Sequence, residues 1–183
     1  YVTESSDDGT GTGTSETLKK YEVTPGGCIV GEAADGAASI VKVNSGGTCN
    51  LEGGLLTIKN SSSYSGDAHI ISNSGTLNLS GGYVAGGKDS CWGGGIFSEN
   101  GTVNMSGGVI ADNYGTNGGG LCVKGGSFTM SGGVISGNGT HSADVKTGSW
   151  DRGLGGGVFA QGATVRIEGG YITNNSEYGK CEQ

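Results

Sequence analysis

The chain has 183 residues, of which 42 are glycine and one is proline, so it is neither collagen-like nor a proline-rich linker. The formal net charge of −7 disfavours a nucleic-acid partner, whose phosphates attract basic patches. No segment approaches the roughly 20 consecutive apolar residues of a membrane-spanning helix, so we expect no membrane insertion.

The first 17 residues are acidic and rich in glycine, serine and threonine. This composition predicts a polar linker or a loosely attached N-terminal cap over residues 1–17, and one repeat domain over residues 18–183. The chain holds five cysteines but no CxxC pair. The sequence therefore predicts no metal site and no cofactor, and it leaves the pairing of the cysteines open.

A ten-residue unit, GTVNMSGGVI at residues 101–110, recurs along this domain. Its copies are GTCNLEGGLL at 47–56, GTLNLSGGYV at 75–84, GSFTMSGGVI at 126–135 and a looser ATVRIEGGYI at 163–172. With an imperfect first copy that begins at Tyr21, the first apolar positions lie 28, 28, 26, 25 and 37 residues apart. A period in the twenties indicates a solenoid.

Each copy alternates apolar and polar residues, as at Leu77 and Leu79, and a Gly-Gly bend then leads to a second short apolar run. Period two is typical of a strand with one buried face. A third strand is expected seven residues before each copy, with its inward residue at Ile70, Ile96, Leu121 and Val158. We therefore predict an all-β, right-handed parallel β-helix of about six rungs of 25–28 residues.

Asparagine recurs three residues after an apolar position, and stacked amides can satisfy one another along the axis of a solenoid. We predict such ladders at turns, against the simpler alternative of separate surface asparagines. The six asparagines with this spacing are Asn44, Asn73, Asn100, Asn113, Asn138 and Asn175.

The step of 37 residues between Phe128 and Val165 predicts a loop insertion at residues 139–153. Aromatic residues gather at the same corner, and aromatic faces stack on sugar rings. The hypothesis is a carbohydrate-binding corner; the alternative is that these aromatics cover the open side of the core. The candidate ligand-binding residues are Tyr64, Asp89, Trp92, Tyr114, His141, Trp150, Asp151 and Arg152.

Two other functions remain open. A polysaccharide lyase or hydrolase on this fold would need carboxylates clustered across adjacent rungs, whereas most outward residues here are threonine, asparagine and serine. An ice-binding protein would need a flat hydroxyl array, and the threonines Thr48, Thr76, Thr102 and Thr164 would form one column. Ordinary β-favouring threonine on a solvent-facing strand explains the same pattern.

The repeat T-Φ-N-Φ-S-G-G, followed by GGG-Φ, resembles the adhesin-like right-handed β-helix repeats of bacterial cell-surface proteins. The segment GGGIFSEN at residues 93–100 also contains two short motifs similar to those of chlamydial polymorphic membrane proteins. This resemblance implies a secreted or cell-surface module without catalytic activity. It also implies a glycan or a host surface protein as partner, and further domains in the same polypeptide.

Overall fold

The computed structural model describes residues 28–32, 39–59, 69–88, 92–140 and 153–177; of residues 28–32 and 59 it describes only the backbone. Residues 1–17, for which a polar linker or an N-terminal cap is predicted, lie outside these ranges. All regular elements within them are β-strands, and no helix occurs there. The strands are short and pair only in parallel, which agrees with the predicted all-β class.

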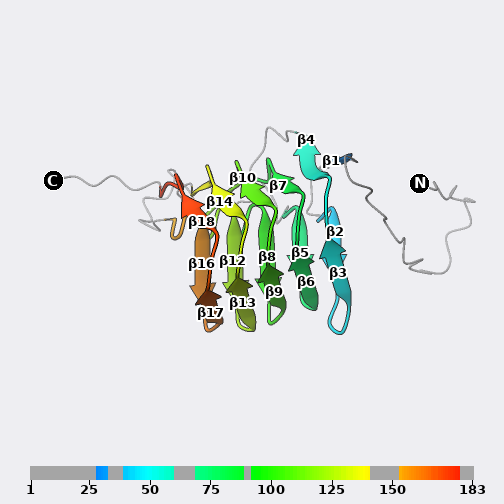
Figure 1. Cartoon of the computed structure of the whole chain (residues 1–183). Helices are drawn as coiled ribbons and strands as arrows, with labels where there is room; N and C mark the ends of the chain where they lie inside the picture. Colours follow the sequence, from blue (N-terminus) through cyan, green and yellow to red (C-terminus); the bar gives the residue numbers. More distant parts are fainter. Residues whose placement is uncertain (1–27, 33–38, 60–68, 89–91, 141–152, 178–183) are drawn as a thin grey trace, which may run out of the picture.

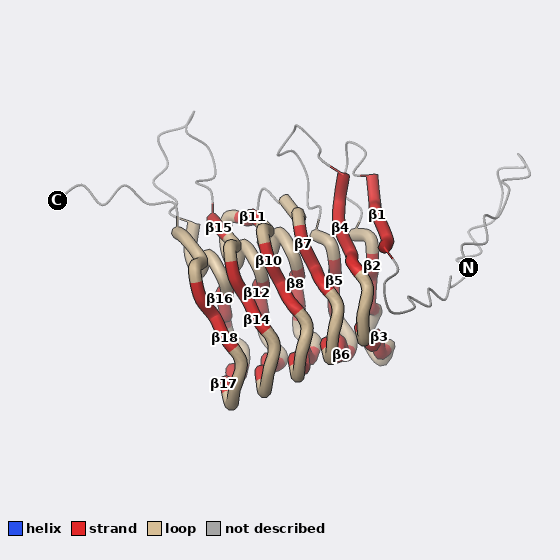
Figure 2. Tube along the Cα trace, turned by 45° about the horizontal axis from the view of Figure 1, so that its top comes forward, coloured by secondary structure: helices blue, strands red, loops and turns tan. Residues whose placement is uncertain are grey.

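Three sheets run along the molecule (Figures 1 and 2). Sheet A consists of β1 (Cys28–Glu32), β4 (Leu55–Lys59), β7 (Tyr83–Ala85), β10 (Val109–Ala111), β14 (Val134–Ser136) and β18 (Tyr171–Thr173). Sheet B consists of β2 (Val41–Val43), β5 (Ile71–Asn73), β8 (Ile96–Glu99), β12 (Leu121–Lys124) and β16 (Val158–Gln161). Sheet C consists of β3 (Thr48–Leu51), β6 (Thr76–Leu79), β9 (Thr102–Met105), β13 (Ser127–Met130) and β17 (Thr164–Ile167).

The chain visits sheets B, C and A in turn and then returns to B, so each strand pairs with the equivalent strand of the neighbouring repeat. Strands of three to five residues cannot form a sheet within one repeat, and pairing between repeats is what satisfies their backbone groups. The structure thus confirms a parallel β-solenoid. A fourth, two-stranded sheet joins β11 (Tyr114–Gly115) to β15 (Gly139–Thr140).

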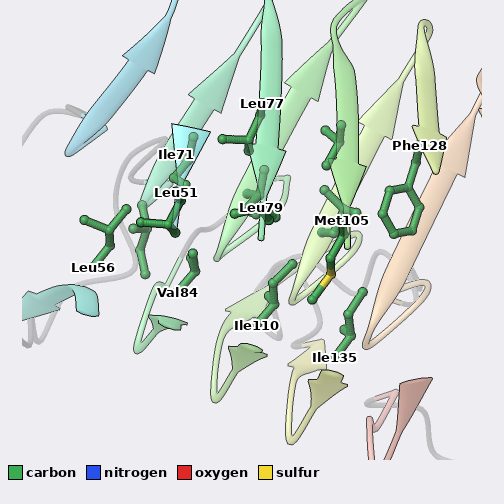
Figure 3. Close-up of a cluster of buried hydrophobic side chains, with 14 of the residues drawn as sticks. Leu51, Leu56, Ile71, Leu77, Leu79, Val84, Met105, Ile110, Phe128 and Ile135 are labelled. Atoms are coloured by element: carbon green, nitrogen blue, oxygen red, sulfur yellow. The ribbon is translucent and has the colours of Figure 1, made fainter. Parts of the chain in front are cut away.

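The core lies between the three sheets, where equivalent side chains of successive rungs stack on one another (Figure 3). Leu77, Val103 and Phe128 occupy one column of sheet C and have no exposed surface. Such a stack buries each side chain against its equivalents above and below, so few apolar residues per rung suffice. The second column of sheet C and the column of sheet A are Leu79, Met105 and Met130, and Val84, Ile110 and Ile135.

One predicted core position is wrong by a residue. Ile71, and not Ile70, pairs with Ile96 in sheet B, although both isoleucines are fully buried. The cause is the turn after β5: Asn73 pairs with Ser98 and Thr76 with Thr102, so this turn is one residue shorter than its successor. The predicted constant spacing of seven residues, from the inward residue of sheet B to the first apolar residue of sheet C, therefore does not hold in this rung.

The Gly-Gly bends between sheets C and A have two different physical causes. At Gly107 a Cβ atom would lie 2.2 Å from the backbone oxygen of Ser80 in the neighbouring rung, so even a methyl group forces the rungs apart. At Gly108 the backbone has φ of +78°, a conformation that residues with a side chain adopt at a cost. The first glycine permits close stacking, whereas the second permits the bend and also close stacking, because a Cβ atom at Gly108 would lie 2.6 Å from Gly81 O.

These causes can be separated by two substitutions. We expect Gly107→Ala to lower the free energy of unfolding by about 3 kcal/mol, because its methyl group meets backbone that cannot move aside. Gly46→Ala should cost about 1 kcal/mol, because Gly46 has positive φ but no atom within 4 Å of the added Cβ. Urea denaturation of both variants measures the difference, and equal losses would contradict it.

Candidate functional site

The three corners of the solenoid differ in how much they vary. The turns from sheet C to sheet A have the same length in every repeat: residues 52–54, 80–82, 106–108, 131–133 and 168–170. The segments from sheet A to sheet B differ in length: residues 33–40, 60–70, 86–95, 112–120 and 137–157. We call the corner formed by these last segments the variable corner. The turns from sheet B to sheet C vary less: residues 44–47 in one repeat and 74–75, 100–101, 125–126 and 162–163 in the others. The corner that varies most on a regular scaffold is the place where function is most often found.

The backbone of the variable corner takes part in the stacking. Tyr114 pairs with Gly139 between β11 and β15, and Trp92 and Leu154 each form a parallel bridge to Asn117. Of the predicted insertion at 139–153, residues 139–140 belong to β15, and Gly153 is buried. Residues 141–152 lie outside the described residues. The segments on both sides of the insertion are therefore held in the rung.

A ladder of three asparagines runs beneath this corner and confirms part of the predicted ladder. Asn113 Nδ2 donates to Asn138 Oδ1 at 3.0 Å, and Asn138 Nδ2 donates to Asn175 Oδ1 at 2.9 Å. Each side-chain nitrogen also donates to a carbonyl of the preceding rung, as Asn138 Nδ2 does to Ile110 O at 2.9 Å. The backbone N–H groups of Asn113 and Asn138 donate to the next asparagine oxygen. The ladder thus satisfies amides that are buried, as buried polar groups require.

The other three asparagines do not form the predicted ladder. Asn73 Nδ2 donates to Ser98 Oγ at 3.0 Å instead, because the register places Ser98 and not Asn100 beside it. Asn100 itself is exposed and has φ of 56°, so it serves the turn through its left-handed backbone. The prediction of a ladder is wrong at this corner, between sheets B and C, because the buried Asn73 has Ser98 as its partner and the exposed Asn100 lies outside that register.

Of the eight candidate ligand-binding residues, Trp92 and Tyr114 lie in the described part of the chain, both at the variable corner. Tyr114 is 41% exposed, and its ring lies against Gly139, where an added Cβ would approach ring carbon Cε1 to 2.7 Å. The remaining six, which are Tyr64, Asp89, His141, Trp150, Asp151 and Arg152, lie outside the described residues.

Trp92 belongs to a second apolar layer on the outer face of sheet B. Its ring lies 6.0 Å from that of Phe159, centroid to centroid, and Lys124 Nζ lies 4.4 Å from the centroid of the indole. Cys122 pairs with Phe159 in an outward-facing column of this sheet, yet it has no exposed surface. The half-buried tryptophan therefore helps to cover the sheet, which supports the alternative that this aromatic is a cover and not a sugar-binding residue. The ammonium group of Lys124 also occupies one face of its ring.

Sequence reasoning missed this layer, although a signal for it exists. β9 and β13 alternate apolar and polar residues, whereas β8 begins Ile-Phe, β12 Leu-Cys-Val and β16 Val-Phe. Unbroken apolar runs are typical of strands that are buried on both faces. His69 extends the layer: its ring lies 4.8 Å from that of Phe97, and its Nδ1 lies 3.1 Å from Gly93 O.

The buried ladder should contribute far more to stability than exposed amide contacts. We expect Asn138→Ala to lower the free energy of unfolding by about 2–4 kcal/mol, because its buried backbone and side-chain partners would be left without a hydrogen bond. Asn104→Ala is the matched control: it removes one exposed amide contact, to Asn78 at 2.9 Å, and should cost less than about 1 kcal/mol. Equal effects in urea titrations would show that the ladder has no special role.

No protein-family model, curated protein or solved structure matches this chain. Among the described residues, no group of three or more His, Cys, Asp or Glu side chains is placed to hold a metal ion. No helix long and apolar enough to cross a membrane occurs in that part of the chain either.

Proposed function

We propose that this chain is a non-catalytic structural and adhesive module of a bacterial surface protein, located outside the cell. Its solenoid winds as a right-handed β-helix of about six rungs and acts as a rod. The rod presents the variable corner to a glycan or to a host surface protein. The adhesin-like repeat at residues 101–110 and its copies support this assignment.

One observation carries the proposal: the rungs differ far more in length at the variable corner than at the other two corners. A catalytic β-helix would instead need converging acid and base groups on a sheet face. The outward column of sheet C holds Asn50, Asn78 and Asn104, whose amides bond to one another at 2.8 and 2.9 Å. Amides have no acid–base function near neutral pH, so this face supports a structural role.

Within the variable corner, Tyr114 is the described aromatic that is best placed to meet a sugar. Its ring is partly exposed and rests on the backbone of Gly139, which holds it in place. Trp92 lies on the neighbouring rung, where Lys124 would have to move before a sugar could stack on that ring face. A rigid, partly exposed aromatic loses little conformational entropy when it binds.

A glycan array tests the proposal. If a glycan binds, we expect Tyr114→Ala to weaken its binding about tenfold, which corresponds to one lost aromatic contact. The matched control is Tyr83→Ala, which removes an exposed tyrosine from sheet A, away from the corner, and should leave binding unchanged. Equal losses of glycan binding in both variants would contradict a site at the variable corner. If no glycan on the array binds, a host surface protein remains as the proposed partner.

Ice binding is a second candidate, which a column of threonines on sheet C brings into consideration. Thr48, Thr76 and Thr102 stand in register on sheet C, beside the column of Asn50, Asn78 and Asn104. Arg166 and Glu168 interrupt this face at its end, where an ice plane requires a flat, uncharged surface. We therefore expect no thermal hysteresis in a nanolitre osmometer. Hysteresis that Thr76→Lys abolishes would favour ice binding over adhesion.

A further inference from the structure

Asparagine followed by glycine is a chemically reactive pair in a protein chain. The backbone nitrogen of the glycine can attack the side-chain carbonyl carbon of the asparagine, and glycine has no Cβ atom to obstruct this attack. The chain contains three such pairs, and all of them lie in the described residues: Asn100-Gly101, Asn117-Gly118 and Asn138-Gly139. Because their surroundings differ, the structure distinguishes protected pairs from a reactive one.

The pair Asn138-Gly139 is held at both reacting groups. Asn138 is 1% exposed, and its side-chain nitrogen donates to Ile110 O and to Asn175 Oδ1, each at 2.9 Å. The backbone nitrogen of Gly139 donates to Asn113 O, also at 2.9 Å. Ring closure would have to break these hydrogen bonds inside the folded structure, so the asparagine ladder protects this pair.

The pair Asn117-Gly118 is held at the glycine. Asn117 is half-buried and forms parallel bridges with Trp92 and with Leu154. The backbone nitrogen of Gly118 donates to Leu154 O at 2.8 Å. This nitrogen becomes a nucleophile only when the rungs separate at this point, so we expect the pair to react slowly.

The pair Asn100-Gly101 is held at neither reacting group. It forms the two-residue turn between β8 and β9, and Asn100 is exposed. Among the described residues, neither the side-chain amide of Asn100 nor the backbone nitrogen of Gly101 has a hydrogen-bond partner. The turn is fixed by other atoms: Asn100 N donates to Lys124 O at 2.7 Å, and Gly101 O accepts from Ser127 N at 3.0 Å. The nucleophile and the amide that it attacks are therefore both available.

We propose that Asn100 is a site of spontaneous deamidation, which replaces its side-chain amide with a carboxylate. The backbone nitrogen of Gly101 attacks Cγ of Asn100. The new N–Cγ bond forms, the Cγ–Nδ2 bond breaks, and Nδ2 leaves as ammonia with the proton of the glycine amide. Water then hydrolyses one of the two C–N bonds of the cyclic imide. Opening at one bond gives aspartate, and opening at the other gives isoaspartate, in which the backbone runs through the side-chain carbon.

The two products affect the turn differently. Aspartate leaves the backbone unchanged, and it tolerates the left-handed conformation of Asn100, which has φ of 56°. Isoaspartate lengthens the backbone by one methylene group in a turn whose two strands are both held in register, β8 by β12 and β9 by β13. We therefore expect the isoaspartate form to unfold at a lower urea concentration than the aspartate form, once chromatography has separated them.

Peptide mapping by mass spectrometry, after incubation in heavy-oxygen water, tests the assignment. The folded chain is kept in a mildly alkaline buffer, which favours loss of the glycine amide proton. Each deamidation takes up one heavy oxygen atom, which distinguishes it from deamidation during sample preparation. We expect Asn100 to react about tenfold faster than Asn138 or more, because Asn138 first has to break its hydrogen bonds.

Two controls separate the effect of the fold from the chemistry of the pair. In concentrated urea all three pairs should react at similar rates, so a difference confined to the folded chain comes from the structure. Asn100→Gly removes the reacting amide and keeps a residue that adopts positive φ, so this variant should fold and lose the modification at this position alone. Equal rates at Asn100 and Asn138 in the folded chain, or an unmodified Asn100 while the urea sample reacts, would overturn the proposal.

Discussion

Backbone pairing between successive rungs is the interaction on which the rest of this structure depends. A strand of three or four residues gains almost nothing alone, and it becomes stable only when the equivalent strand of the next repeat lies about 4.8 Å away in the same register. Register then fixes which side chains stack. Because Phe128 lies above Val103, and Ile135 above Ile110, the core forms as columns that run along the axis.

The same constraint limits where the chain can vary. A residue added within β9 would move every following side chain of that strand to the opposite face. A methyl group at the bends would push against the backbone of the neighbouring rung, as at Gly107. The variable corner accepts the largest insertions without disturbing the sheets, and the ladder of Asn113, Asn138 and Asn175 secures its base. Differences between repeats, and hence any recognition site, therefore collect there.

Sequence reasoning reached the columns of sheet C because alternation and the Gly-Gly bend repeat there almost without change. It failed where the signal lies outside the repeat. Ile71 takes the place predicted for Ile70 because the turn after β5 is one residue shorter than the turn in the next rung. The contact of Trp92 with Phe159 joins distant parts of the chain. Asn100 and Asn113 follow the same local pattern, yet only Asn113 joins a ladder, because the register between rungs, and not the local spacing, decides which side chains lie beside each other.

Hydrogen exchange, measured by NMR for each backbone amide, tests most directly whether stacking between rungs holds the fold together. We expect the slowest exchange in the central rungs, for amides such as that of Ile96, which donates to Gly120 O at 2.9 Å. Protection should fall toward β16, β17 and β18 in dilute solution, where the last rung has a neighbour on one side only. Rapid exchange in the centre, or protection unrelated to position along the axis, would contradict it.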